Sequence, residues 1–150
     1  MRKIILLLLL CFGIVTFLCA QSTADEIEML LNTNAVTYAQ AARFILEASE
    51  ARVTADPNQA FQYAVEQKWL SRSVSADGTA RLDRIALLIM RSFGIKGGYF
   101  YSVFKNPHYA YHELVYQKII QGRTDPSMAV SGDILLFVTG KALAQKEQGN

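Results

Sequence analysis

Apolar side chains recur at four-residue intervals after Pro57 and again after Pro107. These positions are Phe61, Val65 and Trp69 in the first stretch, and Tyr111, Val115 and Ile119 in the second. The spacing is that of one helix face, so it predicts an amphipathic helix in each stretch. Asp56 and Asn106 stand immediately before the prolines, where their side chains can cap a helix whose first residue is proline.

A polar loop and a second apolar segment follow each predicted helix. The loops are expected at 71–79 and 121–126, and the second helices at about 82–93 and 131–143. The earlier of these is apolar on every side over 85–90, which predicts the most buried helix of the protein, and Gly94 is expected to end it. Four side chains are expected in the core in particular: Trp69, Ala86, Leu88 and Ile89.

The two helix–loop–helix units resemble each other in sequence. When Pro57 is set over Pro107, the identical positions are Pro57/Pro107, Ala60/Ala110, Val65/Val115, Gln67/Gln117 and Lys68/Lys118. Ordinary residue frequencies give about one identity by chance in such a window. A shorter copy precedes them, because Val36–Leu46 fits over Ala80–Met90 with Thr37 as its N-cap, and 24–32 could be its first helix.

This organisation predicts an all-α fold. We expect a single helical domain over 21–150, made of three helix–loop–helix repeats, the first shortened, packed around a shared core. The repeats are expected at about 24–50, 56–94 and 106–144. Gly97–Phe104 has the composition of a strand, but its place in the linker between two copies favours an irregular or one-turn structure.

Several segments share a pattern with a known family. They are Val36–Ile45, Ala60–Leu70, Asp77-Gly78, Ile85–Ile89 and Ile119–Gly122. Together they resemble the S-layer homology domain, and the resemblance implies three packed helical hairpins that bind an anionic cell-wall polymer. The family's Thr-Arg-Ala-Glu motif becomes Thr37–Gln40, Arg81–Arg84 and Ser131–Ile134, so no copy keeps its arginine or glutamate in place. Fold and polymer binding are therefore separate expectations.

The N-terminus has the pattern of an export signal. Arg2 and Lys3 precede an apolar run, Ile4–Ala20, that ends in small residues. Three outcomes fit this pattern: a signal peptide over 1–20 cleaved after Ala20, a lipidated Cys19, or an uncleaved anchor, since about 17 apolar residues approach the length of a membrane span. Each places the remaining chain in the periplasm or outer envelope of a bacterium, with membrane contact only through an uncleaved leader or lipidated Cys19.

The leader also carries the excess charge and the cysteines. Without Arg2 and Lys3, Lys+Arg falls from 15 to 13, which equals the 13 acidic residues. A neutral domain argues against a nucleic-acid partner, which needs a basic face. Cys11 and Cys19 both lie in the leader, so the mature chain is expected to have no disulfide and no thiolate for catalysis or metal binding.

No residue pattern typical of catalysis is present. His108 and His112 are spaced to share a helix face, as zinc-binding histidine pairs do, but no third ligand stands at a recognisable spacing. No Gly-x-Ser-x-Gly sequence occurs. We therefore expect no enzyme activity, no catalytic residue, no metal and no cofactor. The expected function is a non-enzymatic envelope module that binds a cell-wall polymer or an envelope partner protein; the alternative is a periplasmic helical scaffold or assembly factor that recognises protein only.

Aromatic side chains concentrate around the linker between the last two repeats. Phe104 and Tyr111 are expected to pack one hairpin against the next. Tyr99, Tyr101 and Tyr109 are expected to serve as ligand-binding platforms in the groove between these hairpins, because tyrosine combines an apolar face with a polar tip. Arg84 is the expected contact for an anionic group.

Overall fold

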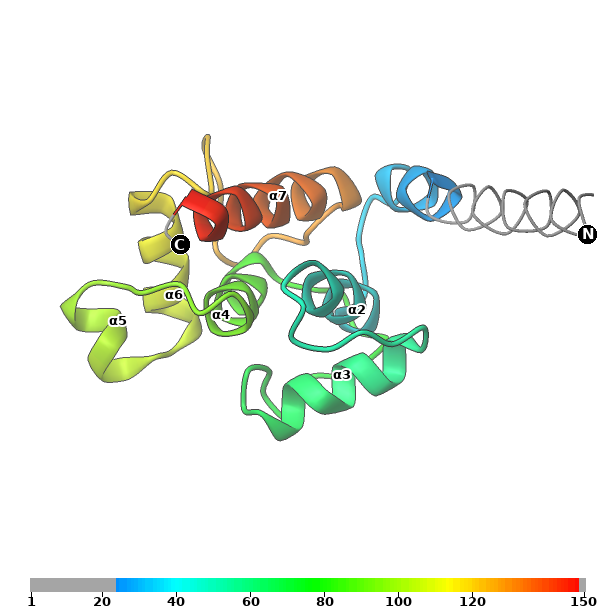
Figure 1. Cartoon of the computed structure of the whole chain (residues 1–150), viewed down its shortest axis with the longest axis horizontal. Coiled ribbons are helices and arrows are strands. Elements are labelled where there is room, and N and C mark those ends of the chain that lie inside the picture. The colour runs from blue at the N-terminus through cyan, green and yellow to red at the C-terminus, as the bar shows by residue number, and fades with distance from the viewer. Residues whose placement is uncertain (1–23, 149–150) are drawn as a thin grey trace, which may run out of the picture.

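The computed structural model of the chain describes residues 24–148, which contain helices and no strands, so the all-α class is confirmed. The predicted signal peptide and Cys19 lie outside these residues. A helical segment over 24–31 comes first (Figure 1). It is followed by α2 (Tyr38–Ala48), α3 (Pro57–Glu66), α4 (Leu82–Ser92), α5 (Tyr99–Phe104), α6 (Pro107–Tyr116) and α7 (Gly132–Gln148). None of the helices described here is both long and apolar enough to cross a bilayer.

The predicted N-caps are confirmed. The Thr37 hydroxyl accepts the Gln40 N–H at 3.2 Å, and the Gln40 side chain accepts the Thr37 N–H at 3.0 Å, which completes a capping box on α2. The side chains of Asp56 and Asn106 accept an N–H from the first turns of α3 and α6. Gly94 adopts φ +66° just after α4, as expected of a helix stop.

Helix α4 forms the centre of the core, between α2 and α6 (Figure 1). All residues from Ile85 to Met90 are buried, which confirms the expectation for Ala86, Leu88 and Ile89. The prediction for Trp69 was wrong, because this side chain is only partly buried. It follows the end of α3, and its ring stands edge-on to Tyr63 with centroids 5.8 Å apart, at the border of the core.

Helix α7 differs from its expected bounds. It continues to Gln148, beyond the predicted end near 143. Every residue from 141 to 148 is a strong helix former, and no glycine or proline interrupts them. Propensity therefore extends this helix past the point where the repeat pattern stops.

A closed ring of backbone hydrogen bonds joins three loops. The Val36 N–H donates to the Val130 carbonyl at 2.8 Å, the Val130 N–H to the Ala80 carbonyl at 2.9 Å, and the Ala80 N–H to the Val36 carbonyl at 2.9 Å. All three residues have no exposed surface. Each stands two residues before a helix, namely α2, α4 or α7, so the ring fixes the starts of these helices relative to one another.

A second set of bonds surrounds the ring. The first N–H of each of these helices is accepted by the loop that precedes another of them. The donors and acceptors are Tyr38 to Gly78 at 3.0 Å, Leu82 to Met128 at 3.1 Å, and Gly132 to Thr33 at 2.9 Å. Helix starts leave N–H groups without intrahelical partners, and here distant main chain satisfies them.

Candidate functional site

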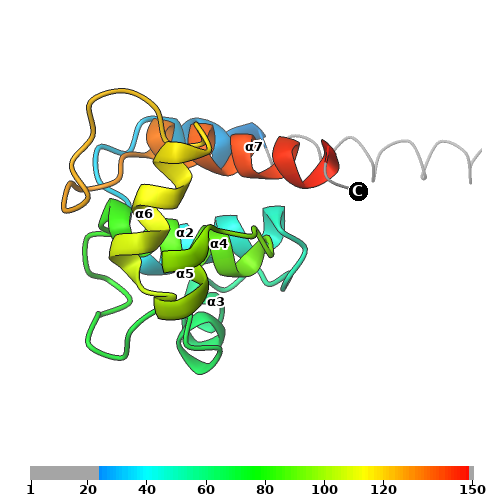
Figure 2. The same ribbon diagram turned by 90° about the vertical axis from the view of Figure 1, so that its left-hand side faces the viewer.

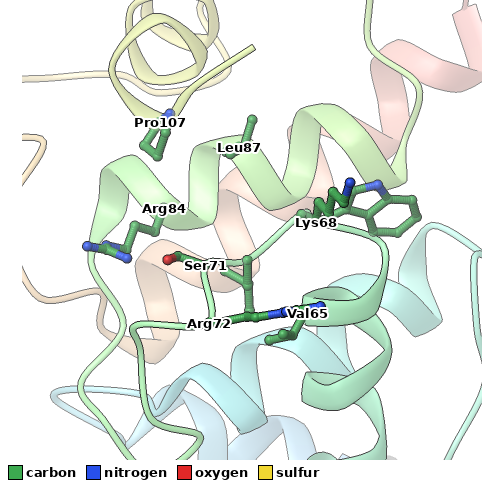
Figure 3. A pocket seen from close by; sticks show the side chains of 9 residues that line it. Val65, Lys68, Ser71, Arg72, Arg84, Leu87 and Pro107 are labelled. Atoms are coloured by element: carbon green, nitrogen blue, oxygen red, sulfur yellow. The ribbon is translucent and has the colours of Figure 1, made fainter.

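A cavity of about 500 Å³ opens where the loop after α3, the first turns of α4 and the start of α6 meet (Figure 3). Its apolar lining comes from Val65, Leu70, Leu87 and Pro107. Its polar and aromatic lining comes from Lys68, Trp69, Ser71, Arg72 and Arg84, and we call the whole the cationic cavity. Ligand sites combine an apolar wall with a few polar groups in this way.

Positive charge in the cationic cavity is not neutralised by its own lining, which has three cations and no carboxylate. The salt bridges in the part of the chain described here involve Arg43 and Arg81, so none engages Lys68, Arg72 or Arg84. The acid beside Arg84 in sequence, Asp83, is paired with Arg81 at 3.0 Å. The cationic cavity therefore offers its charge to an external anion.

A left-handed residue shapes the wall of the cationic cavity. Lys68 adopts φ +60° directly after α3, a conformation that side chains other than glycine rarely take. The turn is held because the N–H groups of Trp69 and Leu70 both donate to the Ala64 carbonyl, at 2.8 and 3.1 Å. Leu70 is buried, while Trp69 is only partly buried and lines the cavity.

Buried tyrosine Tyr38 lies near this positive region. Its hydroxyl accepts the Arg81 N–H at 3.3 Å. Burial raises the pKa of Tyr38, and the Arg81 hydrogen bond and the Arg84 charge partly oppose that rise. The neighbouring Asp83 charge acts in the same direction as burial.

The cationic cavity includes one of the four predicted site residues. Arg84 lines the cationic cavity, but Tyr99, Tyr101 and Tyr109 do not. Tyr99 is 78% exposed on α5, and Tyr109 is half-buried on α6. The expected groove with these three tyrosines around Arg84 is therefore not formed by this cavity.

Tyr101 cannot act as an exposed platform, because it is only 6% exposed. Its ring packs so closely over Gly97 that a Cβ at that position would overlap it. Phe104 also differs from expectation, since it is 55% exposed rather than packed between hairpins. Tyr111 is buried as expected, and its hydroxyl donates to the Thr124 carbonyl at 2.8 Å.

Sequence reasoning missed Lys68, Ser71 and Arg72 as cavity residues. In the sequence, Lys68 stands out only as a position shared by two repeats. A usable signal does exist, because no acidic residue occurs between Glu66 and Asp77 around the single tryptophan. The acid-free stretch indicates an anion-binding site only in the folded chain, where Arg84 lies opposite the loop.

The histidine pair does not form a metal centre with other residues described here. His108 and His112 are both exposed, and their ring centroids lie 4.5 Å apart. No group of three or more His, Cys, Asp or Glu side chains within 24–148 is placed to hold a metal ion. A pair of imidazoles alone falls short of the ligand number of a zinc site.

A second cavity, of about 420 Å³, lies between the 24–31 segment, α2 and Pro57. Its one arginine, Arg43, is bonded to Glu26 at 2.9 Å and lies 3.8 Å from Glu47. Because these carboxylates neutralise the guanidinium, this cavity offers no net positive charge. The cationic cavity is therefore the better candidate site for an anionic ligand.

No family model, curated protein or solved structure matches the chain. The chemistry of the cationic cavity therefore bears most directly on function. Its lining contains no carboxylate, imidazole or thiol that could act as a general acid or base. The Ser71 hydroxyl is hydrogen-bonded to that of Ser73 at 2.8 Å. The lining is instead rich in cationic side chains, which can bind an anion.

Proposed function

We propose that this protein is a non-enzymatic, exported module of the bacterial envelope that binds an anionic cell-wall polymer in the cationic cavity. One observation carries the proposal: Lys68, Arg72 and Arg84 line a single cavity that has no carboxylate. Guanidinium groups bind phosphate and carboxylate through paired, charge-assisted hydrogen bonds. Trp69 adds a partly buried aromatic ring to the cavity lining, and aromatic rings can pack on sugar rings.

The exposure of the cations favours a polymer over a small enclosed ligand. Lys68 and Arg72 are exposed, whereas Arg84 is half-buried. A ligand in contact with all three would extend from the cavity onto the open surface. A chain with repeated acidic groups meets this geometry, because successive groups can reach separate cations.

The proposal includes a fold of three divergent helix–loop–helix repeats similar to the S-layer homology domain. The ring of Val36, Ala80 and Val130 supports it, because these residues are equivalent in the predicted repeat register. The turns after α3 and α6 support it as well. Lys68 and Lys118 have φ +60° and +59°, and each is followed by two N–H groups that donate to one carbonyl, of Ala64 or Leu114.

Anion binding in this proposal does not use the family's motif arginine. Of the motif positions, Thr37 caps α2 and Arg81 is paired with Asp83. Arg84 stands where the family has glutamate, so the charge at that position is reversed. The anion contact is thus shifted to Arg84 and the loop cations Lys68 and Arg72.

Retention on purified peptidoglycan sacculi tests this function. The exported chain is expected to be retained on sacculi that carry their acidic polymers, and to be released when those polymers are stripped. A parallel capture from envelope extract tests the alternative scaffold. Discrete partner proteins without retention on sacculi would support a module that recognises protein only.

Export itself is tested by mass spectrometry of the N-terminus of the native protein. A chain that begins at Gln21 supports simple cleavage, and a lipid on Cys19 supports a lipoprotein. A chain that begins at Met1 supports an uncleaved anchor. Recovery from the cytoplasm alone would contradict the envelope location.

A further inference from the structure

Helix α5 turns its apolar side chains toward solvent. Tyr99, Phe100, Val103 and Phe104 are 78%, 60%, 56% and 55% exposed. On a helix these positions share one face, which we call the α5 aromatic face, while Tyr101 points into the core. This is the reverse of a typical surface helix, and contiguous exposed apolar side chains mark an interaction surface.

The α5 aromatic face is held in place by α6. The rings of Phe100 and Phe104 stack against Tyr109 with centroids 5.8 and 5.2 Å apart. At the start of α5, the Gly98 N–H donates to the Glu113 carboxylate at 2.8 Å. These contacts fix the exposed rings before any partner arrives, which lowers the entropy cost of binding.

Positive charge predominates around the α5 aromatic face, with one carboxylate, that of Glu113, at the start of α5. No acidic residue occurs between Asp83 and Glu113, whereas this stretch contains Arg84, Arg91, Lys96 and Lys105. Lys96 and Lys105 are exposed and flank the two ends of α5. The nearby Glu113 carboxylate is already engaged by the Gly98 N–H and by the Gln117 side chain.

We propose that the α5 aromatic face inserts into the interface of an anionic phospholipid bilayer. Aromatic side chains bury in the headgroup region, and neighbouring lysines are attracted to anionic lipids. The charge on both flanks of α5 complements such a surface. This contact is separate from any attachment through the leader and does not depend on polymer binding in the cationic cavity.

The size and position of α5 favour a bilayer over a protein partner. The helix lies at the edge of the fold and packs mainly against α6 (Figures 1 and 2). A six-residue helix is only about 9 Å long, whereas a stable protein interface buries about 800 Å² on each partner. Insertion of a few rings to headgroup depth needs no such area.

A local fluorescence reporter tests this proposal in the exported chain. Trp69→Phe removes the only native tryptophan, and Phe100→Trp then places a reporter on the α5 aromatic face. Tyr116→Trp, at an 83% exposed tyrosine on α6, is the matched control. Vesicles of phosphatidylcholine with phosphatidylglycerol are expected to shift the emission of the first reporter to shorter wavelength and to leave the second unchanged.

Partitioning into the same vesicles gives the energetic test. Replacing Phe100 and Phe104 by alanine should weaken it by about tenfold or more. Lys96→Gln and Lys105→Gln should each weaken binding to the anionic vesicles by about fivefold. Circular dichroism checks that α5 and its neighbours stay folded, and the Phe100→Trp reporter keeps the aromatic stack if the alanine pair disrupts it.

Three outcomes would overturn the proposal. They are no wavelength shift at position 100, an equal shift at position 116, and equal binding to neutral and anionic vesicles. A dimer in analytical ultracentrifugation that is lost with the Phe100 and Phe104 substitutions would instead assign the face to a second copy of the chain.

Discussion

The backbone N–H of Val36 donates to the carbonyl oxygen of Val130 at 2.8 Å, although the two residues stand 94 positions apart in the sequence. Ala80 completes the ring, accepting from Val130 and donating to Val36. A break at any one bond leaves a buried N–H or carbonyl without a partner, which costs about 1–3 kcal/mol. The ring therefore couples the starts of α2, α4 and α7 into one cooperative unit.

Hydrogen exchange tests this coupling. The amide protons of Val36, Ala80 and Val130 are expected to be among the most protected in the protein and to exchange together, because only global unfolding opens all three bonds. The Ser102 N–H, which donates to the Gly98 carbonyl within α5, is expected to exchange faster because α5 lies at the edge. Ring amides that exchange as fast as Ser102, or at clearly different rates from one another, would show that the ring is not a unit.

Two glycines of α7 give a matched pair for testing how closely the 24–31 segment packs. A Cβ at Gly132 would overlap the Leu30 carbonyl, whereas a Cβ at Gly140 meets nothing nearby. Gly132→Ala is expected to lower the free energy of unfolding by about 1–3 kcal/mol, and Gly140→Ala to raise it by about 0.5–1 kcal/mol through better helix propensity. Urea denaturation followed by circular dichroism measures both values. Equal effects at the two positions would mean that the segment does not pack against α7.

Two tyrosines of α5 differ in burial, so their substitution should affect stability differently. Tyr101→Ala is expected to destabilise the fold by about 3–5 kcal/mol, because it removes a buried ring. Tyr99→Ala, at a 78% exposed position, is expected to change stability by no more than about 0.5 kcal/mol. Thermal melting of the two variants checks this order. A larger loss of stability for Tyr99→Ala than for Tyr101→Ala would contradict the burial of Tyr101.

Alkaline pH should destabilise the protein because it favours ionisation of the buried Tyr101. Burial raises the pKa of Tyr101 above its ordinary value of 10.0, with the Arg91 charge opposing the rise. The unfolded chain then releases the tyrosine proton at lower pH than the folded chain, so the free energy of unfolding falls as pH rises from about 10 toward the folded pKa. Tyr101→Phe is expected to make that fall less steep.

The control for this titration is the same variant near pH 8, where neither state of Tyr101 is ionised. Its stability there is expected to stay close to that of the wild type, because the ring is kept. An alkaline fall that is equally steep in both proteins would contradict the assignment to Tyr101.

The sequence predicted most of the helices because their signals are local. The prolines after Asp56 and Asn106, and the apolar run of α4, each specify a helix within a dozen residues. It was harder to predict which aromatic side chains in the linker between the last two predicted repeats are buried. Whether Tyr101 or Phe104 is buried depends on which side of α5 meets α6, and a six-residue helix has too few turns to show an amphipathic pattern.

The candidate site was predicted only in part for a related reason. Arg84 was identified because it begins a helix, but Lys68 and Arg72 belong to a loop that reads as ordinary polar surface. In the folded chain, Lys68 and Arg72 line a cavity together with residues distant in sequence, such as Leu87 and Pro107. The lining of this cavity contains no carboxylate. That information exists only in the tertiary structure.

The most direct test of the proposed function is calorimetric titration of the exported chain with soluble fragments of acidic cell-wall polymer. Wild-type protein is expected to bind the intact fragments, to bind more weakly as salt increases, and not to bind fragments stripped of their acidic groups. Arg84→Gln and Arg72→Gln should each weaken binding by about tenfold, since each removes a charge-assisted hydrogen bond. Arg123→Gln, the same change at an exposed arginine outside the cavity lining, should have no effect. Absence of wild-type binding, or equal affinity of the Arg84→Gln and Arg123→Gln variants, would contradict the cationic cavity as the binding site.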